Sequence, residues 1–284
     1  MASPPTGPAQ YLTRFGDQTI SGNKYALAKL GVDRANCSLK IEEYVILCVP
    51  FQLGFRRSIF LASLSAQELA FFQKYANANV GLSLALNPNK RPEPVKFMVR
   101  CTLSTVGQMK GRDNVGLFVV DYKTSPDEMV VMLGKFMEAQ EKMRTQYEDY
   151  GKTSVRMTAD VAKLLGYNMY ATVGEGSAEP RRIQVFSMSS KTLEHVEAAG
   201  ARVMNPGTAV SFQLFFKKYR VNVNGTVNSA GPLPQGIVRT VSSLEFNPEL
   251  VEVMDDYWYK ARANLKSNPL SDLRVKTNPL SDLR

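Results

Sequence analysis

The segment of residues 123–166 constrains the fold most, because it holds the one long stretch with a clear helical period. Ser125 can cap a helix, Pro126 suits the first helical position, and acidic residues follow at the positive end of the helix dipole. The side chains of one face then recur every three or four residues and are nearly all apolar. They are Met129, Leu133, Phe136, Met137, Gln140, Met143 and Tyr147. Gly151 is a plausible end, and the polar run 145–153 is expected to be a connector.

Short segments with β-type composition, separated by turns, lie on both sides of this helix. The first half predicts roughly five strands and one helix, which begins with a capping box between Ser65 and Glu68. The spacing of the strands in the second half predicts a small antiparallel barrel. A last helix, capped by Asn247 and starting at Pro248, is expected to pack on that barrel. The polar segment 191–198 is predicted to be a loop or a helical turn.

These segments predict a mainly β protein with helices, in which two β-barrel-like domains are joined by an amphipathic helix and linker and a C-terminal helix closes the second domain. We expect a disordered N-terminus at 1–10 and an N-terminal domain at 11–123. The helix and linker occupy 124–153, and the second domain occupies 154–266. Residues 267–284 form a tail that contains Asn-Pro-Leu-Ser-Asp-Leu-Arg twice. This repeat is either a duplication in a disordered end or a docking peptide presented twice.

Charge and cysteine content restrict the surroundings and partners of the chain. The net charge is +9 and three cysteines show no C-x-x-C spacing. The charge favours anionic partners in a non-specific way. The cysteines indicate reduced, structural thiols and a cytoplasmic protein. The longest apolar stretch, residues 44–55, is far shorter than the roughly 20 residues that span a bilayer, so we expect no membrane insertion.

No pattern in the sequence indicates catalysis. The single histidine, His195, lies in a polar segment and is expected to be solvated, and no His/Cys cluster has the spacing of a zinc site. Nucleotide-binding glycine loops and a nucleophile elbow are absent. We therefore expect no enzyme and no cofactor. Basic residues near aromatic ones, such as Arg181, Arg182 and Arg220, could clamp a nucleotide, but a solvated charged face is the favoured interpretation, which makes nucleic acid an unlikely partner.

The order of elements and four segments resemble the PilZ family. These segments are PDEMVVMLGKFMEA at 126–139, MTADVAKLLG at 157–166, PRRIQVFSMSSKT at 180–192 and VRTVSSLEFNPEL at 238–250. The second half is similar to a PilZ domain, a small β-barrel closed by a C-terminal helix. The first half is similar to the PilZ-like domain that precedes it in spirochaete proteins. The resemblance implies a bacterial receptor for cyclic di-GMP.

The resemblance also implies where a ligand would bind, through an R-x-x-x-R motif in the linker and a [D/N]-x-S-x-x-G motif at the end of a strand. The linker keeps the spacing as Lys152 and Arg156, and the strand-end motif aligns with Ser187 and Ser189. The Gly position of that motif holds Thr192. Further candidate ligand residues are Arg144, Arg181 and Arg182.

This combination favours a non-enzymatic PilZ-type adaptor or regulator in cyclic di-GMP or motility (flagellar) signalling, which acts through a protein partner. The first alternative is a true cyclic di-GMP receptor with altered ligand residues. The second alternative is non-specific binding of nucleic acid, based on charge alone.

Overall fold

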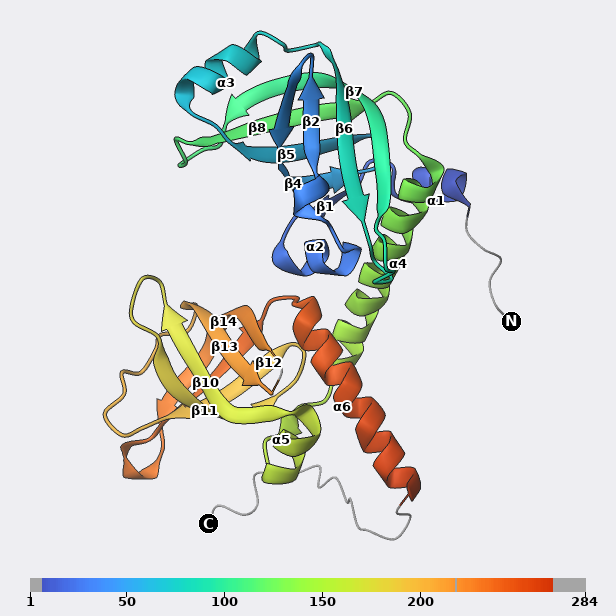
Figure 1. The fold of residues 1–284 in the computed structure, drawn as a ribbon. Helices are drawn as coiled ribbons and strands as arrows, with labels where there is room; N and C mark the ends of the chain where they lie inside the picture. The colour runs from blue at the N-terminus through green and yellow to red at the C-terminus, as the bar shows by residue number, and fades with distance from the viewer. Residues whose placement is uncertain (1–6, 218, 268–284) are drawn as a thin grey trace. The chain divides into compact units, whose positions relative to one another are not determined.

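The computed structural model describes residues 7–217 and 219–267, which divide between residues 141 and 142 into two compact units (Figure 1). The expectations for residues 1–6 and for the repeated heptapeptide at 268–284 lie outside the described residues. The predicted fold class, mainly β with helices, is confirmed.

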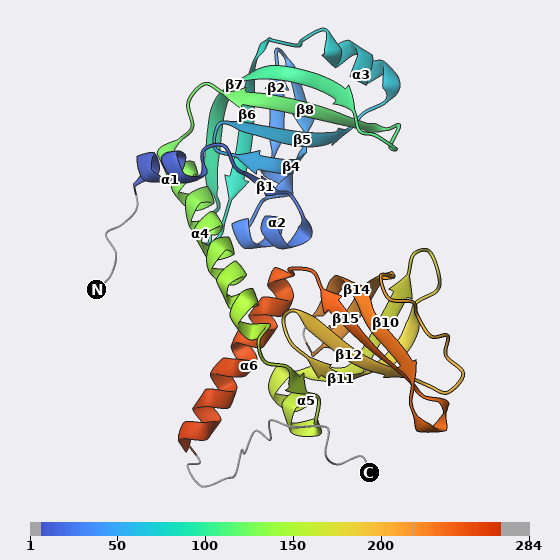
Figure 2. The same cartoon turned by 180° about the vertical axis from the view of Figure 1, so that it is seen from behind.

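The N-terminal unit is built on one antiparallel sheet of eight strands in the order β1-β4-β5-β8-β7-β6-β2-β3. Only Cys48 separates β3 at one edge of this sheet from β4 near the other edge, so the sheet curls back on itself like a barrel (Figures 1 and 2). The strands are β1 (Thr19–Ser21), β2 (Ser38–Ile41), β3 (Tyr44–Leu47), β4 (Val49–Gly54), β5 (Arg57–Ser63), β6 (Asn79–Leu86), β7 (Val95–Gln108) and β8 (Val115–Tyr122).

Four helices accompany this sheet: α1 (Pro8–Phe15), α2 (Lys24–Leu30), the 3-10 helix η1 (Arg34–Asn36) and α3 (Ala66–Gln73). The capping box predicted for α3 is present, with Ser65 and Glu68 bonded reciprocally. Helix α1 begins at Pro8, so the expectation of disorder up to residue 10 is wrong for residues 8–10. The ring of Tyr11 anchors α1, because it is buried and its hydroxyl donates a 2.9 Å hydrogen bond to Glu138.

The predicted long helix is α4 (Asp127–Tyr150). Its start belongs to the N-terminal unit, where Met129, Val130 and Leu133 are fully buried in the core. The hydroxyl of Ser125 donates to the backbone carbonyl of Phe55 and ties the start of α4 to the sheet. Gly134 lets α1 approach closely, since a Cβ atom at this position would lie 2.2 Å from the ring of Tyr11.

The C-terminal unit contains the predicted antiparallel barrel. Six strands close in the order β10-β13-β14-β15-β12-β11, with β11 paired back to β10 and the short β9 added outside β11. The strands are β9 (Val155–Arg156), β10 (Tyr167–Glu175), β11 (Arg181–Met188), β12 (Thr192–Glu197), β13 (Ala209–Phe216), β14 (Arg220–Pro232) and β15 (Val238–Leu244). The helices are α5 (Ala159–Leu165), η2 (Pro234–Gly236) and α6 (Pro248–Ser267).

Helix α6 begins and packs as predicted. The side chain of Asn247 accepts a 2.9 Å hydrogen bond from the backbone N–H of Leu250, and Leu250, Val251 and Met254 are buried. The end of α4 also belongs to this unit, because the hydroxyl of Tyr147 donates to the carbonyl of Leu244 at 2.8 Å. Residues 145–150, expected in a polar connector, are therefore helical, since their tyrosines find partners on the C-terminal unit.

The prediction for residues 191–198 is wrong, because they contain strand β12. Leu193, His195 and Glu197 alternate inward and are all buried, so two polar side chains face the inside of the barrel. This hides the alternation of apolar and polar residues that would have revealed the strand. His195, expected to be solvated, is fully buried with its ring 5.6 Å from that of Phe212.

Candidate ligand-binding face of the barrel

Two of the candidate ligand residues meet where β9 pairs with β11. Arg156 is the register partner of Ser187, and the N–H of Met157 donates to the carbonyl of Phe186 at 2.8 Å. The pairing of β11 with β12 shifts between Val185 and Ser187, and at this irregularity the side chain of Phe186 is exposed.

Two guanidinium groups lie near the ring of Phe186. The guanidinium carbon of Arg156 is 5.2 Å from the centre of the Phe186 ring, and that of Arg239 on β15 is 6.0 Å from it. Both distances are within the range of a cation–π interaction. We call Arg156, Phe186 and Arg239 the Phe186 clamp.

A carboxylate beside the clamp restrains its groups. Glu194 on β12 forms an ion pair with Arg239 and accepts a 2.9 Å hydrogen bond from the hydroxyl of Ser187. The charge of Arg239 is thus partly balanced, and the hydroxyl of Ser187 is already used. Arg156 is the guanidinium of the clamp that stacks on Phe186 at the shorter distance.

Ser189, the position that matches the family motif, stabilises a tight turn between β11 and β12. Its hydroxyl accepts hydrogen bonds from the backbone N–H groups of Lys191 and Thr192, at 3.1 and 3.0 Å, and contacts the hydroxyl of Thr192 at 2.8 Å. The residue is fully buried. Its side chain therefore shapes the hairpin and is not available to a ligand without breaking these bonds.

Arg181 faces the inside of the barrel. Its Nε donates a 2.9 Å hydrogen bond to Oε2 of Glu197, and Nε2 of His195 lies 3.7 Å from Oε1 of the same carboxylate. Burial raises the pKa of the Glu197 carboxyl, but the neighbouring His195 and Arg181 outweigh it and hold that pKa below its usual value. Arg181, His195 and Glu197 form what we call the lumen cluster, in which His195 and Glu197 are buried and the Arg181 side chain is partly exposed.

The remaining candidate residues are engaged at separate places. Lys152 pairs with Asp149 at 2.8 Å, and this hydrogen bond raises the pKa of the Lys152 amine. Arg144 stacks on Phe246 at 4.8 Å. Arg182 stacks on Tyr170 at 5.3 Å on the outer face of the barrel. The structure thus brings together Arg156 and Ser187 but not the full predicted set.

Sequence reasoning missed Phe186, Glu194 and Arg239. Phe186 lies in the quoted segment PRRIQVFSMSSKT, where exposed positions alternate with buried ones, so its outward direction was detectable. Arg239 was not detectable, since its place beside Phe186 depends on the pairing of β12 with β15.

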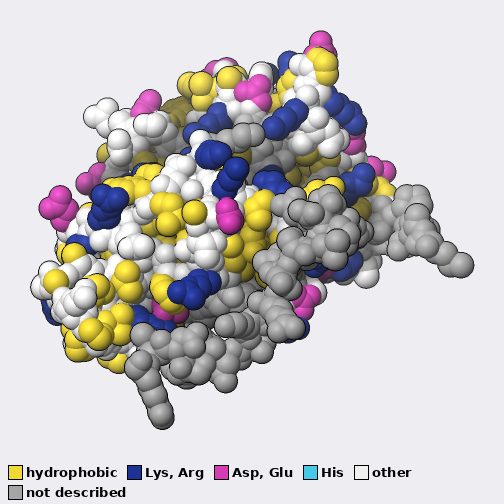
Figure 3. Space-filling view, turned by 90° about the horizontal axis from the view of Figure 1, so that it is seen from below, with side chains coloured by type: hydrophobic (Ala, Val, Ile, Leu, Met, Phe, Trp, Pro, Cys, Tyr) yellow, Lys and Arg dark blue, Asp and Glu magenta, His cyan; other side chains and the backbone are white. Residues whose placement is uncertain are grey.

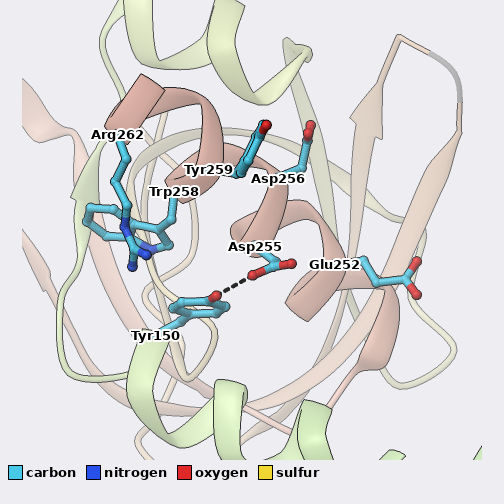
Figure 4. A pocket seen from close by; sticks show the side chains of 7 residues that line it. All are labelled: Tyr150, Glu252, Asp255, Asp256, Trp258, Tyr259 and Arg262. Atoms are coloured by element: carbon cyan, nitrogen blue, oxygen red, sulfur yellow. Dashed lines mark hydrogen bonds between the residues drawn. The ribbon is translucent and has the colours of Figure 1, made fainter. Parts of the chain in front are cut away.

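A hollow of about 330 Å³ lies along α6 beside the last turn of α4 (Figure 4). The hydroxyl of Tyr150 donates to Asp255, which also accepts a 3.0 Å hydrogen bond from Gln146. Burial, followed by the Asp255 bond, raises the pKa of Tyr150 to about 12. In Figure 4 the side chains of Glu252, Asp256 and Tyr259 point away from this pair. The two hydrogen bonds to Asp255 attach the end of α4 to α6, and we read this hollow as part of that structural contact.

Within the described residues, 7–217 and 219–267, no group of three or more His, Cys, Asp or Glu side chains is placed to hold a metal ion. None of the helices in the same part of the chain is long and apolar enough to cross a membrane. The lysine and arginine side chains on the face shown in Figure 3 lie scattered among hydrophobic and polar ones, outside the grey region. The positive charge is thus not gathered in one block on that face.

The C-terminal unit is a closed antiparallel barrel with a C-terminal helix, and a curled antiparallel sheet precedes it, so the chain is a mainly β protein of two units. Residues 9–140 match the model of the PilZN3 domain, so the N-terminal unit of the chain belongs to this domain family. The resemblance seen in the sequence is thereby confirmed. A search of curated proteins found no significant match.

Solved structures of three bacterial proteins are distantly similar to the chain. The PlzA protein of Borreliella burgdorferi, in complex with cyclic di-GMP, is 12% identical with a TM-score of 0.44, covering 88% of this chain and 97% of that one. YcgR of Escherichia coli with cyclic di-GMP is 7% identical with a TM-score of 0.31, covering 88% and 95%. The Bacillus subtilis inhibitor of motility MotI is 9% identical with a TM-score of 0.27, covering 82% and 98%.

Proposed function

We propose that the protein is a non-enzymatic regulator of the PilZ type that acts through protein contacts in cyclic di-GMP or motility signalling. The link to this signalling system rests on the PilZN3 match and on the motif segments of the second half. The adaptor role rests on one observation, an exposed apolar surface on the N-terminal unit.

This surface lies on the outer side of neighbouring strands. Leu47 on β3 and Met98 on β7 are 66% and 73% exposed, and the register Leu47–Ser38–Ser83–Met98 connects them across β3, β2, β6 and β7. Only small serine side chains lie between the two. We call this surface the Leu47–Met98 face.

A second row of the same face carries charge. The register Val45–Lys40–Gly81–Arg100 runs beside the first row, and Val45 is 64% exposed. Leu47, Val45 and Met98 are large apolar side chains exposed on one sheet face with only small or flexible side chains between them, and an exposed apolar surface of this kind is typical of a protein interaction site. The basic side chains of Lys40 and Arg100 add positive charge at this surface, which favours a partner with acidic groups around an apolar centre.

The side chains expected to hold a nucleotide are already bonded within the protein, which supports the adaptor role over a role in nucleotide binding. The hydroxyl groups of Ser187 and Ser189 and the guanidinium of Arg181 are used within the barrel, and Lys152 is paired with Asp149. A ligand would have to replace these bonds, which reduces its net gain.

Site-specific photo-crosslinking in the native cell tests the adaptor role. A benzophenone amino acid at Leu47 is expected to form one discrete crosslinked product, and the same group at the exposed Arg112 in the same unit is expected to form none. Leu47→Glu should abolish the product formed from a probe at Met98 and alter motility, while Arg112→Glu leaves both unchanged. Equal crosslinking from both positions would overturn the proposal.

A second candidate function is that of a cyclic di-GMP receptor with altered ligand residues. The Phe186 clamp favours it, since two guanidinium groups beside an exposed ring can hold a purine and its phosphates. If this function holds, Arg156→Gln must weaken binding of cyclic di-GMP, and Arg144→Gln, which removes a charge that stacks elsewhere, must not.

A further inference from the structure

The outer side of four adjacent barrel strands, β11, β10, β13 and β14, carries a continuous row of polar side chains. The register Arg182–Thr172–Gln213–Asn222 runs directly across these strands. Neighbouring strands are about 4.8 Å apart, so this row spans about 14 Å. The residues that alternate with it, including Ile183, Val173, Phe212 and Val223, are buried inside the barrel.

Aromatic rings lie beside this row. Tyr170 and Phe215 contact each other edge to face at 4.9 Å, and the guanidinium of Arg182 stacks on Tyr170. Tyr170 is 38% exposed, and Arg220 is the register partner of Phe215. The aromatic pair is therefore flanked by a guanidinium on each side, on the same outer face.

Three side-chain amides on this face are available to a ligand. The side-chain amides of Gln184, Gln213 and Asn222 form no hydrogen bond within the described part of the chain. The hydroxyl of Thr172 also has no hydrogen-bond partner there, but it is buried, so the amides and not this hydroxyl can reach a ligand. Amides offer both donors and acceptors, which suits the edges of nucleic-acid bases.

A hollow of about 530 Å³ adjoins the same face at β11. Met169, Val196 and Ile237 supply apolar walls, and Arg182 and Gln184 supply polar ones. Its volume falls within the range of ligand pockets, and Arg182 belongs both to the hollow and to the stack on Tyr170.

None of the outward residues that form this face is a carboxylate; they are Arg182, Gln184, Tyr170, Thr172, Ser211, Gln213, Phe215, Arg220, Asn222 and Asn224. The carboxylate that reaches the hollow, Glu197, is bound to Arg181. Acidic residues lie near Tyr219, next to Arg220. Burial is the main cause that raises the pKa of Tyr219, and the negative charges of Asp256, Glu252 and Glu249 raise it further. They limit the anion-binding part of the face at its β14 edge.

We propose that this outer face binds single-stranded nucleic acid, with bases on the Tyr170–Phe215 pair and phosphates on Arg182 and Arg220. Exposed rings that stack bases, flanked by guanidiniums that hold the backbone, are the elements that such sites combine. The hollow beside β11 would take one further base. The face adjoins the Phe186 clamp along β11, since Gln184 lies two residues from Phe186 and shares a register row with Arg239 through Val196. The proposed contacts at Tyr170, Phe215, Arg182 and Arg220 nevertheless use none of the three clamp residues. The sequence alone had favoured a solvated charged face here, and the structure adds the shared row and the aromatic pair.

Fluorescence anisotropy of the full chain with labelled oligo-dT and oligo-U, about fifteen nucleotides long, tests the proposal. We expect binding that weakens steeply between about 50 and 200 mM salt. Tyr170→Ala should weaken it about fivefold to hundredfold, the effect of losing one stacked base, while Tyr170→Phe keeps it. Arg182→Gln should lower the slope of log affinity against log salt by about 0.7.

Arg112→Gln is the matched control, because it removes the same charge from an exposed site in the N-terminal unit. Each variant is first shown to melt like the parent. The proposal is wrong if the parent binds neither oligonucleotide, or if Arg112→Gln weakens binding as much as Arg182→Gln. Displacement of the oligonucleotide by a neutral oligosaccharide would also overturn it, since the same amides and rings would then serve a sugar.

Discussion

Arg181 and Glu197 form a 2.9 Å hydrogen-bonded ion pair inside the barrel of the C-terminal unit, where the Glu197 side chain is 3% exposed. A charge of this kind is costly to bury unless it is paired. His195, 3.7 Å away on the same strand, completes the cluster. The barrel thus keeps a buried charge beside a core that is made mostly of apolar side chains.

The first prediction concerns the acid stability of this unit. Glu197→Gln should lower the free energy of unfolding by about 1.5–3 kcal/mol at pH 7, the value of a charged hydrogen bond. Because the pKa of Glu197 is depressed in the folded state, its contribution is complete above the unfolded value of about 4.3 and is lost as pH falls through the folded pKa. The difference between parent and variant should therefore shrink in acid.

Trp258 provides the measurement, since it is the one tryptophan and packs against the barrel core. Urea unfolding followed by its fluorescence at neutral and acid pH gives the two free energies. Glu179→Gln, an exposed carboxylate in the same unit, serves as control. If the difference in the free energy of unfolding between the parent and Glu197→Gln stayed constant from pH 7 to acid, the charge of the Glu197 carboxylate would contribute nothing to stability.

A second prediction follows from the contact between Gly134 and Tyr11. In an exposed helix interior, alanine is about 1 kcal/mol more favourable than glycine. Gly134→Ala should nevertheless destabilise the N-terminal unit, because the new Cβ would meet the Tyr11 ring. In a Tyr11→Ala background the same change should become neutral or stabilising. A double-mutant cycle from thermal melts measures this coupling, and additive effects would contradict it.

The third prediction is weak or absent binding of cyclic di-GMP. Lys152 supplies a point charge in place of a bidentate guanidinium, and the hydroxyl of Ser189 is saturated. Two missing charged contacts of about 1.5–3 kcal/mol each correspond to a loss of about two to four orders of magnitude in affinity. Titration calorimetry checks it, and a submicromolar dissociation constant would refute it. Lys152→Arg, which restores the R-x-x-x-R spacing, should increase the affinity.

The fourth prediction is that the three thiols are inert in the native protein. Cys37, Cys48 and Cys101 are all buried. The contact with Cys37, followed by burial, raises the pKa of the Cys48 thiol, and burial raises that of Cys101 to about 12. Ellman's reagent at pH 8 should modify none of them before unfolding and all three in guanidinium chloride. Rapid modification of the native chain would show that the β2–β3 region opens.

The sequence predicted those elements whose signals are local. The caps at Ser65 and Asn247 and the apolar positions of α4 and α6 depend on residues a few positions apart, and the structure contains them. Strand β12 was missed because His195 and Glu197 replace apolar residues on its inner face. Its pairing with β11 and β15 stabilises the strand in spite of that composition.

The candidate site was less predictable for the same reason. Arg156 and Ser187 were found through motif spacing, but Arg239 and Glu194 reach the site through pairings between distant strands. Arg181 and Arg182 are adjacent in sequence, yet one bonds Glu197 inside the barrel and the other stacks on Tyr170 outside. The alternation of a strand predicts this separation but not which of the two faces inward.

The closure of the barrel has a consequence for how fast the C-terminal unit folds. Strand β10 pairs both with β11, its neighbour in the chain, and with β13, which is synthesised much later. The second pairing requires a long loop to close before its contacts can form, and such non-local pairing is typical of folding in milliseconds to seconds. During that interval β10 has one unsatisfied edge, so a nascent chain stalled before residue 209 would present an open strand to its neighbours.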